Sequence, residues 1–327
     1  MILNDTHNRV HDYLRISLTD NCNLRCFYCM PEEDYEFTPT KHLMQADEIE
    51  AIAKTFVEQG VKKIRLTGGE PLIRKDAADI ILRLSKLPIT LTMTTNGTRL
   101  HDFLPVLEEA NLRKLNISLD TLDAEKFLKV TRRNQFDLIM KNINLLLAKN
   151  FTIKINVVVM KDFNDNEIND FVAWTKDFPL EIRFIEFMPF TGNRWTTNQV
   201  LSLEEILQII SEKYEFLPIA PKPNDTAKHF SVPGHKGNFA VISTMTSPFC
   251  GTCNRIRLTA DGKLKNCLFS KGETDLLKPY RKGEDILPLI QTNILSKAKA
   301  LGGQFDNTLN TLEALAIENR SMISIGG

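Results

Sequence analysis

The residues with the clearest chemical potential are six cysteines that fall into two sets of three. We call them the N-terminal triplet, Cys22, Cys26 and Cys29, and the C-terminal triplet, Cys250, Cys253 and Cys267. A structural zinc site and an ordinary iron–sulfur cluster each require four protein ligands. Two separate sets of three therefore indicate two metal clusters, each with one position left open for a small molecule.

Three simpler explanations of the cysteines fit less well. Free cysteines are often buried as small hydrophobes, but the N-terminal triplet is flanked by Asn, Arg and Asp. Disulfides are disfavoured because the N-terminus has no apolar signal-peptide region, so we expect a reducing compartment, the cytoplasm. A zinc knuckle fits the C-x3-C-x2-C spacing poorly, and none of the nearest histidines, His7, His11 and His42, completes the set convincingly.

The composition limits the classes of partner. The 327 residues include 41 Lys and Arg and 41 Asp and Glu, which gives a net charge of zero. A general nucleic-acid or membrane-surface binder would carry an excess of basic residues, and no apolar run reaches the length of a membrane span. We therefore expect neither nucleic acid nor membrane as a partner, although a small anionic substrate held by a local arginine cluster remains compatible.

Short β-rich runs alternate with amphipathic helical stretches from residue 13 to about 190. The expected strands are 14–18, 63–66, 89–93, 114–119, 152–159 and 181–187, and the expected helices between them are 46–59, 77–86, 104–110, 138–149 and 166–176. Six strands alternating with helices predict an α/β fold with a parallel sheet, closed as a barrel or left open.

The polar and glycine-rich segments follow the ends of these strands. The N-terminal triplet follows the first strand, 67–71 (Thr-Gly-Gly-Glu-Pro) the second, and 94–97 (Thr-Thr-Asn-Gly) the third; 118–120 closes the fourth, and Met188 follows the sixth. Ligands of parallel α/β folds bind at the C-terminal ends of the strands, so these segments are expected to form one site.

The pattern changes after Pro189. A helix is predicted at 203–213, with Ser202 as its N-cap and Glu205 at the capping-box position, and another at 284–300. Short strands are expected within 228–245. Residues 255–265 predict a β-hairpin that turns at Asp261-Gly262, which would bring Cys267 back towards the other two cysteines of the C-terminal triplet.

The N-terminal triplet, with an aromatic residue before its third cysteine, resembles the cluster loop of radical S-adenosylmethionine (SAM) enzymes. The resemblance implies a [4Fe–4S] cluster whose fourth iron binds SAM, and a 5′-deoxyadenosyl radical formed from that SAM. The Gly-Gly-Glu-Pro segment resembles the superfamily segment that meets the SAM amino group. By the same resemblance, SAM would contact Tyr28, Gly69, Glu70, Ser118 and Met188.

The C-terminal triplet, within 249–267, narrows the resemblance to the GTP 3′,8-cyclases, which catalyse the first step of molybdenum cofactor biosynthesis. Further similarity covers 13–20, 63–71, 184–188, 191–193 and the Gly-Gly tail. The family implies a second [4Fe–4S] cluster that binds guanine, removal of a ribose hydrogen, and attack on C8 to give 3′,8-cyclo-7,8-dihydro-GTP. It also implies a partly open (β/α)6 TIM-like barrel, which we place at 1–220, and a C-terminal region at 221–327 that carries the second cluster.

A triphosphate in a neutral protein needs local positive charge, and Arg is suited to bidentate phosphate contacts. The resemblance implies that GTP contacts Arg15, Arg65, Thr94, Lys154, Arg255 and Arg257. Arg183 on the sixth strand and Ile256 complete the expected GTP-binding set. The resemblance further implies that the tail residues Gly326 and Gly327 reach into the active site and support catalysis there together with Arg255 and Arg257.

The sequence departs from the family pattern at 5–9 and at Ala240. Both positions lie outside the expected ligand set, so they concern local loop shape more than function. The alternatives are a radical SAM peptide-modifying enzyme, which normally has more C-terminal cysteines, an iron–sulfur electron carrier, and a zinc-dependent nucleic-acid-binding module. Besides GTP, the family implies a reducing electron donor and a downstream pterin-forming enzyme as partners. Monomer and homodimer both remain open.

Overall fold

The computed structural model describes residues 2–30, 35–193, 195–304 and 317–326. Within these residues the strands form one sheet in the order β12-β11-β10-β1-β2-β3-β4-β5-β6-β9-β8-β7. The strands are β1 Tyr13–Ser17, β2 Lys63–Thr67, β3 Thr90–Thr95, β4 Lys114–Ser118, β5 Thr152–Val159, β6 Glu181–Glu186, β7 Leu217–Ile219, β8 Lys228–Ser231, β9 Asn238–Ile242, β10 Arg255–Leu258, β11 Lys263–Lys265 and β12 Thr274–Asp275.

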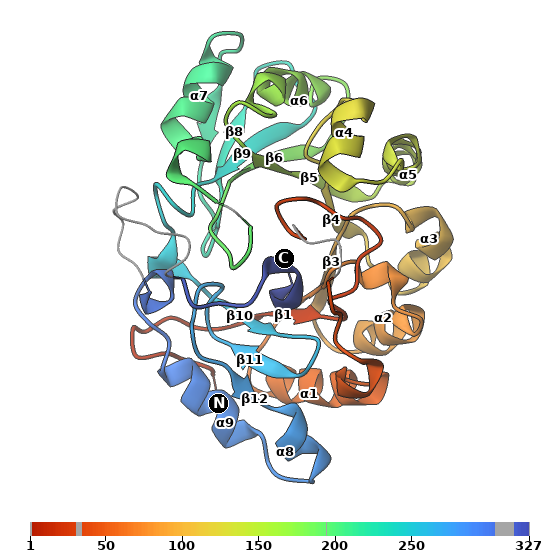
Figure 1. The fold of residues 1–327 in the computed structure, drawn as a ribbon, viewed down its shortest axis with the longest axis vertical. Coiled ribbons are helices and arrows are strands. Elements are labelled where there is room, and N and C mark those ends of the chain that lie inside the picture. The colour runs from red at the N-terminus through yellow and green to blue at the C-terminus, as the bar shows by residue number, and fades with distance from the viewer. Residues whose placement is uncertain (1, 31–34, 194, 305–316, 327) are drawn as a thin grey trace.

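The six predicted strands are confirmed as β1 to β6, and each pairs with the next in parallel. The C-terminal region extends both ends of this sheet, because β10 pairs in parallel with β1 and β9 pairs in parallel with β6. The remaining strands add antiparallel pairs at the two edges. The sheet curves into an open arc, and the C-terminal segment lies near its centre (Figure 1).

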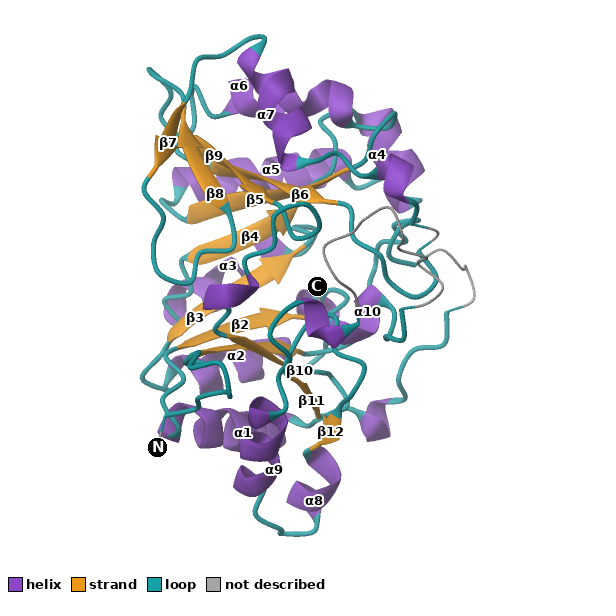
Figure 2. Ribbon diagram, turned by 90° about the vertical axis from the view of Figure 1, so that its left-hand side faces the viewer, coloured by secondary structure: helices purple, strands orange, loops and turns teal. Residues whose placement is uncertain are grey.

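Helices cover the outer side of the arc, as Figures 1 and 2 show for α1 to α6. The α-helices are α1 Ala46–Glu58, α2 Ala77–Ser85, α3 Leu100–Glu109, α4 Ala124–Thr131, α5 Phe136–Ala148, α6 Ile168–Trp174, α7 Leu203–Ser211, α8 Leu277–Arg281, α9 Leu287–Leu295 and α10 Met322–Ile325. Apolar side chains from these helices and from the sheet form a larger hydrophobic core. Among the described residues, no helix has the length and apolar character needed to cross a lipid bilayer.

A smaller hydrophobic core lies at the C-terminal ends of the strands. It consists of Met160, Phe187, Phe190, Trp195, Val200, Met245, Phe269, Leu301 and Ile325. Phe27, Tyr28, Met188, Cys250 and Cys267 pack against it. Segments from both ends of the chain therefore meet around one apolar centre.

Local sequence signals predicted some of these helices and turns correctly and one helix wrongly. Helix α7 has the predicted capping box, in which Ser202 accepts from the Glu205 backbone and the Glu205 carboxylate accepts from the Ser202 backbone. The hairpin of β10 and β11 turns at Gly262, whose φ is 71°. The long helix predicted at 284–300 is wrong, because α9 covers only Leu287–Leu295. Pro288 favours a start there, since proline has no backbone N–H to donate.

Candidate active site

A cavity of about 510 Å³ lies inside the arc of the sheet. Its lining includes seven of the eight residues expected to bind GTP, the expected SAM ligand Met188, and the whole C-terminal triplet. The seven are Arg15, Arg65, Thr94, Lys154, Arg183, Arg255 and Arg257. The eighth, Ile256, has its side chain in the larger core instead, because neighbouring side chains of a strand point to opposite faces.

Three arginines form a row across adjacent strands of the cavity wall. Arg15 on β1 is the register partner of Arg257 on β10 and of Arg65 on β2. Burial and the neighbouring Arg257 lower the pKa of Arg15, and burial and Arg255 lower the pKa of Arg257 to about 10. Because like charges side by side in a buried site repel one another, the row favours an anionic ligand.

Sequence reasoning missed two residues of the same wall, Tyr13 and Lys63. Arg65 Nε donates to the Tyr13 hydroxyl at 2.5 Å, and the Lys63 ammonium lies 4.4 Å from the Tyr13 ring centre. Burial raises the pKa of Tyr13, but Arg65, Arg15 and Lys63 outweigh it and lower that pKa to about 7. Both residues stand two positions before an expected arginine on the same strand, so the period of two could have identified them.

Sequence reasoning also missed the carboxylate of Glu181. This carboxylate partly neutralises Lys154 and Arg183, so less of their positive charge is available to a ligand. It accepts from Lys154 Nζ at 2.8 Å and from Arg183 Nε, and it lies 3.4 Å from His229 Nδ1. These neighbours hold the pKa of Glu181 well below its usual value against the effect of burial. Lys154 and Arg183 therefore share one counter-charge.

Unsatisfied polar atoms point to a polar ligand in the cavity. Arg255 Nη1 and Asn156 Oδ1 are buried and have no hydrogen-bond partner among the described residues. Both side chains line the cavity, and the Arg255 guanidinium also lies 4.8 Å from the centre of the Phe249 ring. Buried polar atoms without partners are costly, so a ligand that bonds them would bind favourably.

The N-terminal triplet lies in the loop after β1, against the end of α4. Backbone N–H groups of Arg25 and Phe27 donate to the carbonyls of Thr131 and Val130 at 2.9 and 3.1 Å. Cys22 Sγ accepts from the backbone N–H of Leu24 at 3.4 Å.

Burial dominates the protonation of these thiols. It is the main cause that raises the pKa of Cys22 to about 11 and that of Cys29 to about 12, and it raises the pKa of Cys26 as well. Besides burial, Cys22 and Cys29 raise the pKa of Cys26, and Cys22 raises the pKa of Cys29. Such thiols become thiolates when a cation such as iron displaces their protons, so the triplet fits an iron–sulfur cluster.

The Gly-Gly-Glu-Pro segment packs against this loop. A Cβ on Gly69 would lie 2.3 Å from the Asn21 carbonyl oxygen, so only glycine allows this approach. The Glu70 carboxylate is fully buried and accepts from the backbone N–H groups of Leu72 and Asn96 and from the Thr95 hydroxyl. Since these bonds come from the chain itself, they give Glu70 a role in shaping the loop.

The other expected SAM contacts lie close by. The Tyr28 hydroxyl donates to Asp120 Oδ2 at 2.6 Å, and Asp120 Oδ1 accepts from the Val158 N–H at 2.9 Å. Tyr28 and Met188 pack against the same smaller core, and Ser118 ends β4 opposite Asn156 of β5.

The C-terminal triplet has a more positive environment than the N-terminal one. Burial raises the pKa of Cys253, but Arg255 and Lys297 outweigh it and lower that pKa to about 6. The loop is held by Arg9, whose guanidinium donates to the carbonyls of Cys250, Ala298 and Lys299 at 2.8–2.9 Å. Sequence reasoning missed Arg9, which ends the 5–9 segment and matches the arginine of the family pattern there.

In the described part of the chain, no three His, Cys, Asp or Glu side chains converge closely enough to hold one metal ion. The cysteines of an iron–sulfur cluster bind different iron atoms and need not converge on one point.

The C-terminal tail reaches the ends of β1 and β2. The Gly326 carbonyl accepts from Arg257 Nη1 at 2.7 Å, and Gly326 has φ 82°. A Cβ there would lie 2.7 Å from Thr67 Oγ1 and 2.8 Å from Ser17 Cβ. Gly327 lies outside the described residues. Arg320 of the tail donates hydrogen bonds to Asp261 at 2.9 and 3.0 Å and to Glu273 at 2.6 Å, and these bonds attach the tail to the β10–β11 hairpin and the segment after it.

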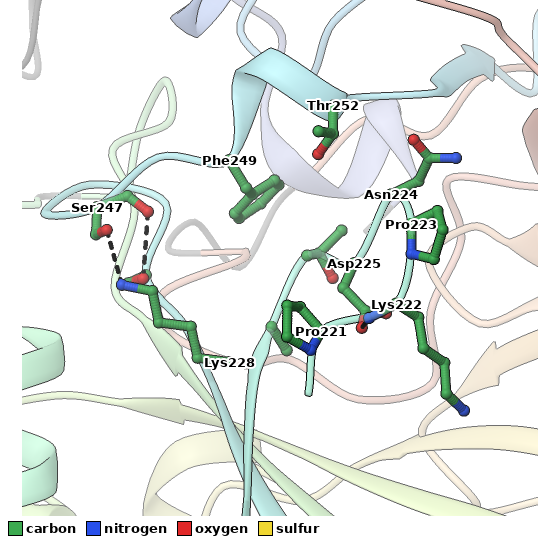
Figure 3. A pocket seen from close by; sticks show the side chains of 12 residues that line it. Pro221, Lys222, Pro223, Asn224, Asp225, Lys228, Ser247, Phe249 and Thr252 are labelled. Atoms are coloured by element: carbon green, nitrogen blue, oxygen red, sulfur yellow. Dashed lines mark hydrogen bonds between the residues drawn. The ribbon is translucent and has the colours of Figure 1, made fainter. Parts of the chain in front are cut away.

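A second cavity, of about 420 Å³, adjoins the first beside the loop between β7 and β8. Figure 3 shows Phe249 and Thr252 on one side of it and Pro223, Asn224 and Asp225 on the other. Phe249 and the loop residues 223–226 line both cavities. This loop therefore forms part of the wall between the two cavities.

Comparisons with known proteins agree with this site. The sequence model of the Radical SAM superfamily matches residues 16–175, and that of Molybdenum Cofactor Synthesis C matches residues 180–302. The Streptococcus suis SuiB structure bound to S-adenosylmethionine has a TM-score of 0.64 at 16% identity and covers 97% of this chain and 75% of its own. These matches define a radical SAM protein with an additional molybdenum cofactor synthesis region. The superfamily implies a [4Fe–4S] cluster and SAM as cofactors.

Relatives with similar sequences narrow this class of protein to one enzyme family. The mitochondrial GTP 3′,8-cyclase of Arabidopsis thaliana is 44% identical over 100% of this chain and 84% of its own length. The GTP 3′,8-cyclase of Peptoclostridium acidaminophilum is 40% identical over 100% and 98%. The chain belongs to the GTP 3′,8-cyclase family. It spans about half the length of several animal relatives, such as 51% of molybdenum cofactor biosynthesis protein 1 of Mus musculus, with which it is 44% identical.

Proposed function

We propose that this chain is a GTP 3′,8-cyclase that converts GTP to (8S)-3′,8-cyclo-7,8-dihydro-GTP, the first step of molybdenum cofactor biosynthesis. The observation that carries the proposal is the row of Arg15, Arg65 and Arg257 beside the C-terminal triplet in one cavity. The row suits a triphosphate, and the adjacent cysteines suit a cluster with an open position for a purine base.

The two parts of the chain would divide the work. Residues 1–220 would supply the N-terminal triplet and the SAM contacts, and residues 221–327 the second [4Fe–4S] cluster and the tail. When bound, the first cluster and SAM supply a 5′-deoxyadenosyl radical for hydrogen-atom removal. The buried loop around Glu70 and the smaller core at Tyr28 and Met188 would keep water from that radical.

The reaction balances with two electrons from a reducing donor. One electron would be used at the cluster that Cys22, Cys26 and Cys29 would hold, where SAM would supply the radical and release methionine. The radical would accept the C3′ hydrogen atom of the GTP ribose and so become 5′-deoxyadenosine, and a new bond would join C3′ to C8 of guanine. The second electron and one proton complete the 7,8-dihydro product. Arg255 and Arg257, with Gly326 and Gly327 of the tail, would hold the substrate in position for ring closure.

The remaining partners are proposals of the same kind. They are GTP as substrate, an electron donor and a pterin-forming enzyme that consumes the product. A cytoplasmic location suits clusters that require a reducing compartment, although the plant relative is named mitochondrial. A peptide-modifying activity has less support, because the SuiB likeness at 16% identity reflects the fold alone.

The test uses reconstituted protein under strict anaerobiosis. Metal analysis should give about eight irons and no zinc per chain, as two [4Fe–4S] clusters require. SAM and a strong reductant are then supplied with GTP or with ATP, and 5′-deoxyadenosine and nucleotide loss are measured. GTP-selective 5′-deoxyadenosine formation with matching GTP loss is expected. SAM cleavage that ignores GTP would reject the substrate, and no cleavage by fully loaded protein would reject the enzyme.

A further inference from the structure

A buried lysine, Lys297, lies beside the C-terminal triplet and was not among the residues expected from the sequence. Lys297 follows α9 and is only 3% exposed to solvent. Its Nζ lies 3.5 Å from Cys253 Sγ and donates to the Arg255 carbonyl oxygen at 2.8 Å. It therefore reaches a sulfur of the triplet and the strand that carries two substrate arginines.

A buried ammonium requires a counter-charge, and the described neighbours of Lys297 point to the triplet as its source. Of the two hydrogen-bond acceptors of its ammonium among the described residues, the Arg255 carbonyl is neutral, so the Cys253 sulfur is the contact that can carry negative charge. An unpaired buried ion is strongly unfavourable because it has lost its contact with water. Anionic sulfur at Cys253 offsets that cost.

The N-terminal triplet has a different electrostatic setting. Cys22 Sγ accepts from the neutral Leu24 N–H at 3.4 Å and from the neutral Asn96 amide at 3.8 Å. Cys22 therefore accepts from neutral donors, whereas Cys253 accepts from the ammonium of Lys297.

We propose that Lys297 is a positioning residue that raises the reduction potential of the second cluster through its hydrogen bond to Cys253 Sγ. This rests on the proposed function, because it requires a cluster on the C-terminal triplet. Net charge and hydrogen bonds to sulfur set the potentials of iron–sulfur clusters. A cationic donor stabilises the more negative, reduced form, and a charge-assisted hydrogen bond is about twice as strong as a neutral one.

The test isolates the second cluster. Cys22, Cys26 and Cys29 are all replaced by Ala, and the midpoint potential of the remaining cluster is measured by anaerobic redox titration with EPR detection. In this background Lys297→Met should shift the one-electron equilibrium at least tenfold towards the oxidised form, which is about 59 mV to lower potential. Lys297→Arg should stay near the parent and Lys297→Gln should fall between them. Lys278→Met, at an 82% exposed side chain, is the matched control.

The outcomes separate the two proposals. A parent variant that binds no iron would overturn the second cluster itself, and with it the role of Lys297. Bound iron with the same potential in all Lys297 variants would overturn the role of Lys297 alone. If Lys297→Met loses iron, the comparison of Lys297→Gln with Lys297→Arg decides, and equal potentials there would refute the inference.

Discussion

Replacing Arg320 by Gln should release the C-terminal tail from the active site while the rest of the fold stays intact. Arg320 makes a two-pronged contact with Asp261 and a further bond to Glu273, and the side chains of the three residues are 24%, 18% and 16% exposed. Asp261 belongs to the turn between β10 and β11, so these bonds tie the tail to the hairpin that carries Arg257.

The expected magnitude lies between two known limits. Exposed ion pairs contribute about 0–1 kcal/mol, and breaking a buried pair costs about 3–5 kcal/mol. For this partly exposed network we expect a loss of about 2 kcal/mol in tail docking, which is about 30-fold in the equilibrium constant. The tail segment 317–326 should therefore open about 30 times more often than in the parent protein.

Hydrogen exchange followed by mass spectrometry measures this opening directly. The peptide that contains α10 should exchange about 30-fold faster in Arg320→Gln, while peptides of β1 to β6 keep their rates. Arg99→Gln is the control, because the ion pair of Arg99 with Asp102 has exposed side chains (43% and 42%) and lies far from the tail in the sequence. An unchanged tail rate, or faster exchange throughout the sheet, would refute the reasoning that this network holds the tail.

Three further predictions address the tail and the C-terminal triplet. Gly326→Ala should reduce GTP turnover at least tenfold with iron content unchanged, as should deletion of Gly326 and Gly327; Gly234→Ala, at a similar φ of 81° but with open space around its Cβ, should retain turnover. Arg9→Gln should lower the iron content from about eight to about four irons per chain, because it loosens the loop of the C-terminal triplet. An unchanged iron content would contradict this. In iron-free protein, iodoacetamide should alkylate Cys253 at a rate that levels off above about pH 6, because its thiolate then predominates. Cys29 should still gain reactivity towards pH 12, and equal pH profiles of the two cysteines by mass spectrometry would contradict the expected difference between their pKa values.

Local pattern was sufficient to predict β1 to β6 and the loops at their ends. Each strand is a short apolar run with a period of two, and each functional segment follows its strand directly, so neighbours in the sequence carry the information. The cavity lining follows for the same reason, since Arg15, Arg65 and Arg183 lie on predicted strands.

The parts that could not be predicted depend on contacts between distant segments. Nothing near β10 in the sequence indicates that it pairs with β1, some 240 positions earlier, with Arg257 opposite Arg15. The same holds for Arg9, which reaches the Cys250 carbonyl, and for Lys297 beside Cys253. The role of Glu181 was missed for another reason: the sequence of β6 alone does not show that its first carboxylate faces Lys154 of the neighbouring strand.

The pairing of β10 with β1 also constrains how the protein can be made and divided. The arginine row requires a strand from each end of the chain, so it forms only after the ribosome has released residue 258. Until then β1 is an unpaired edge of a parallel sheet, a surface that favours aggregation. A fragment that ends at residue 220 would keep that edge for good, so the two regions are not expected to work as separately expressed, exchangeable modules.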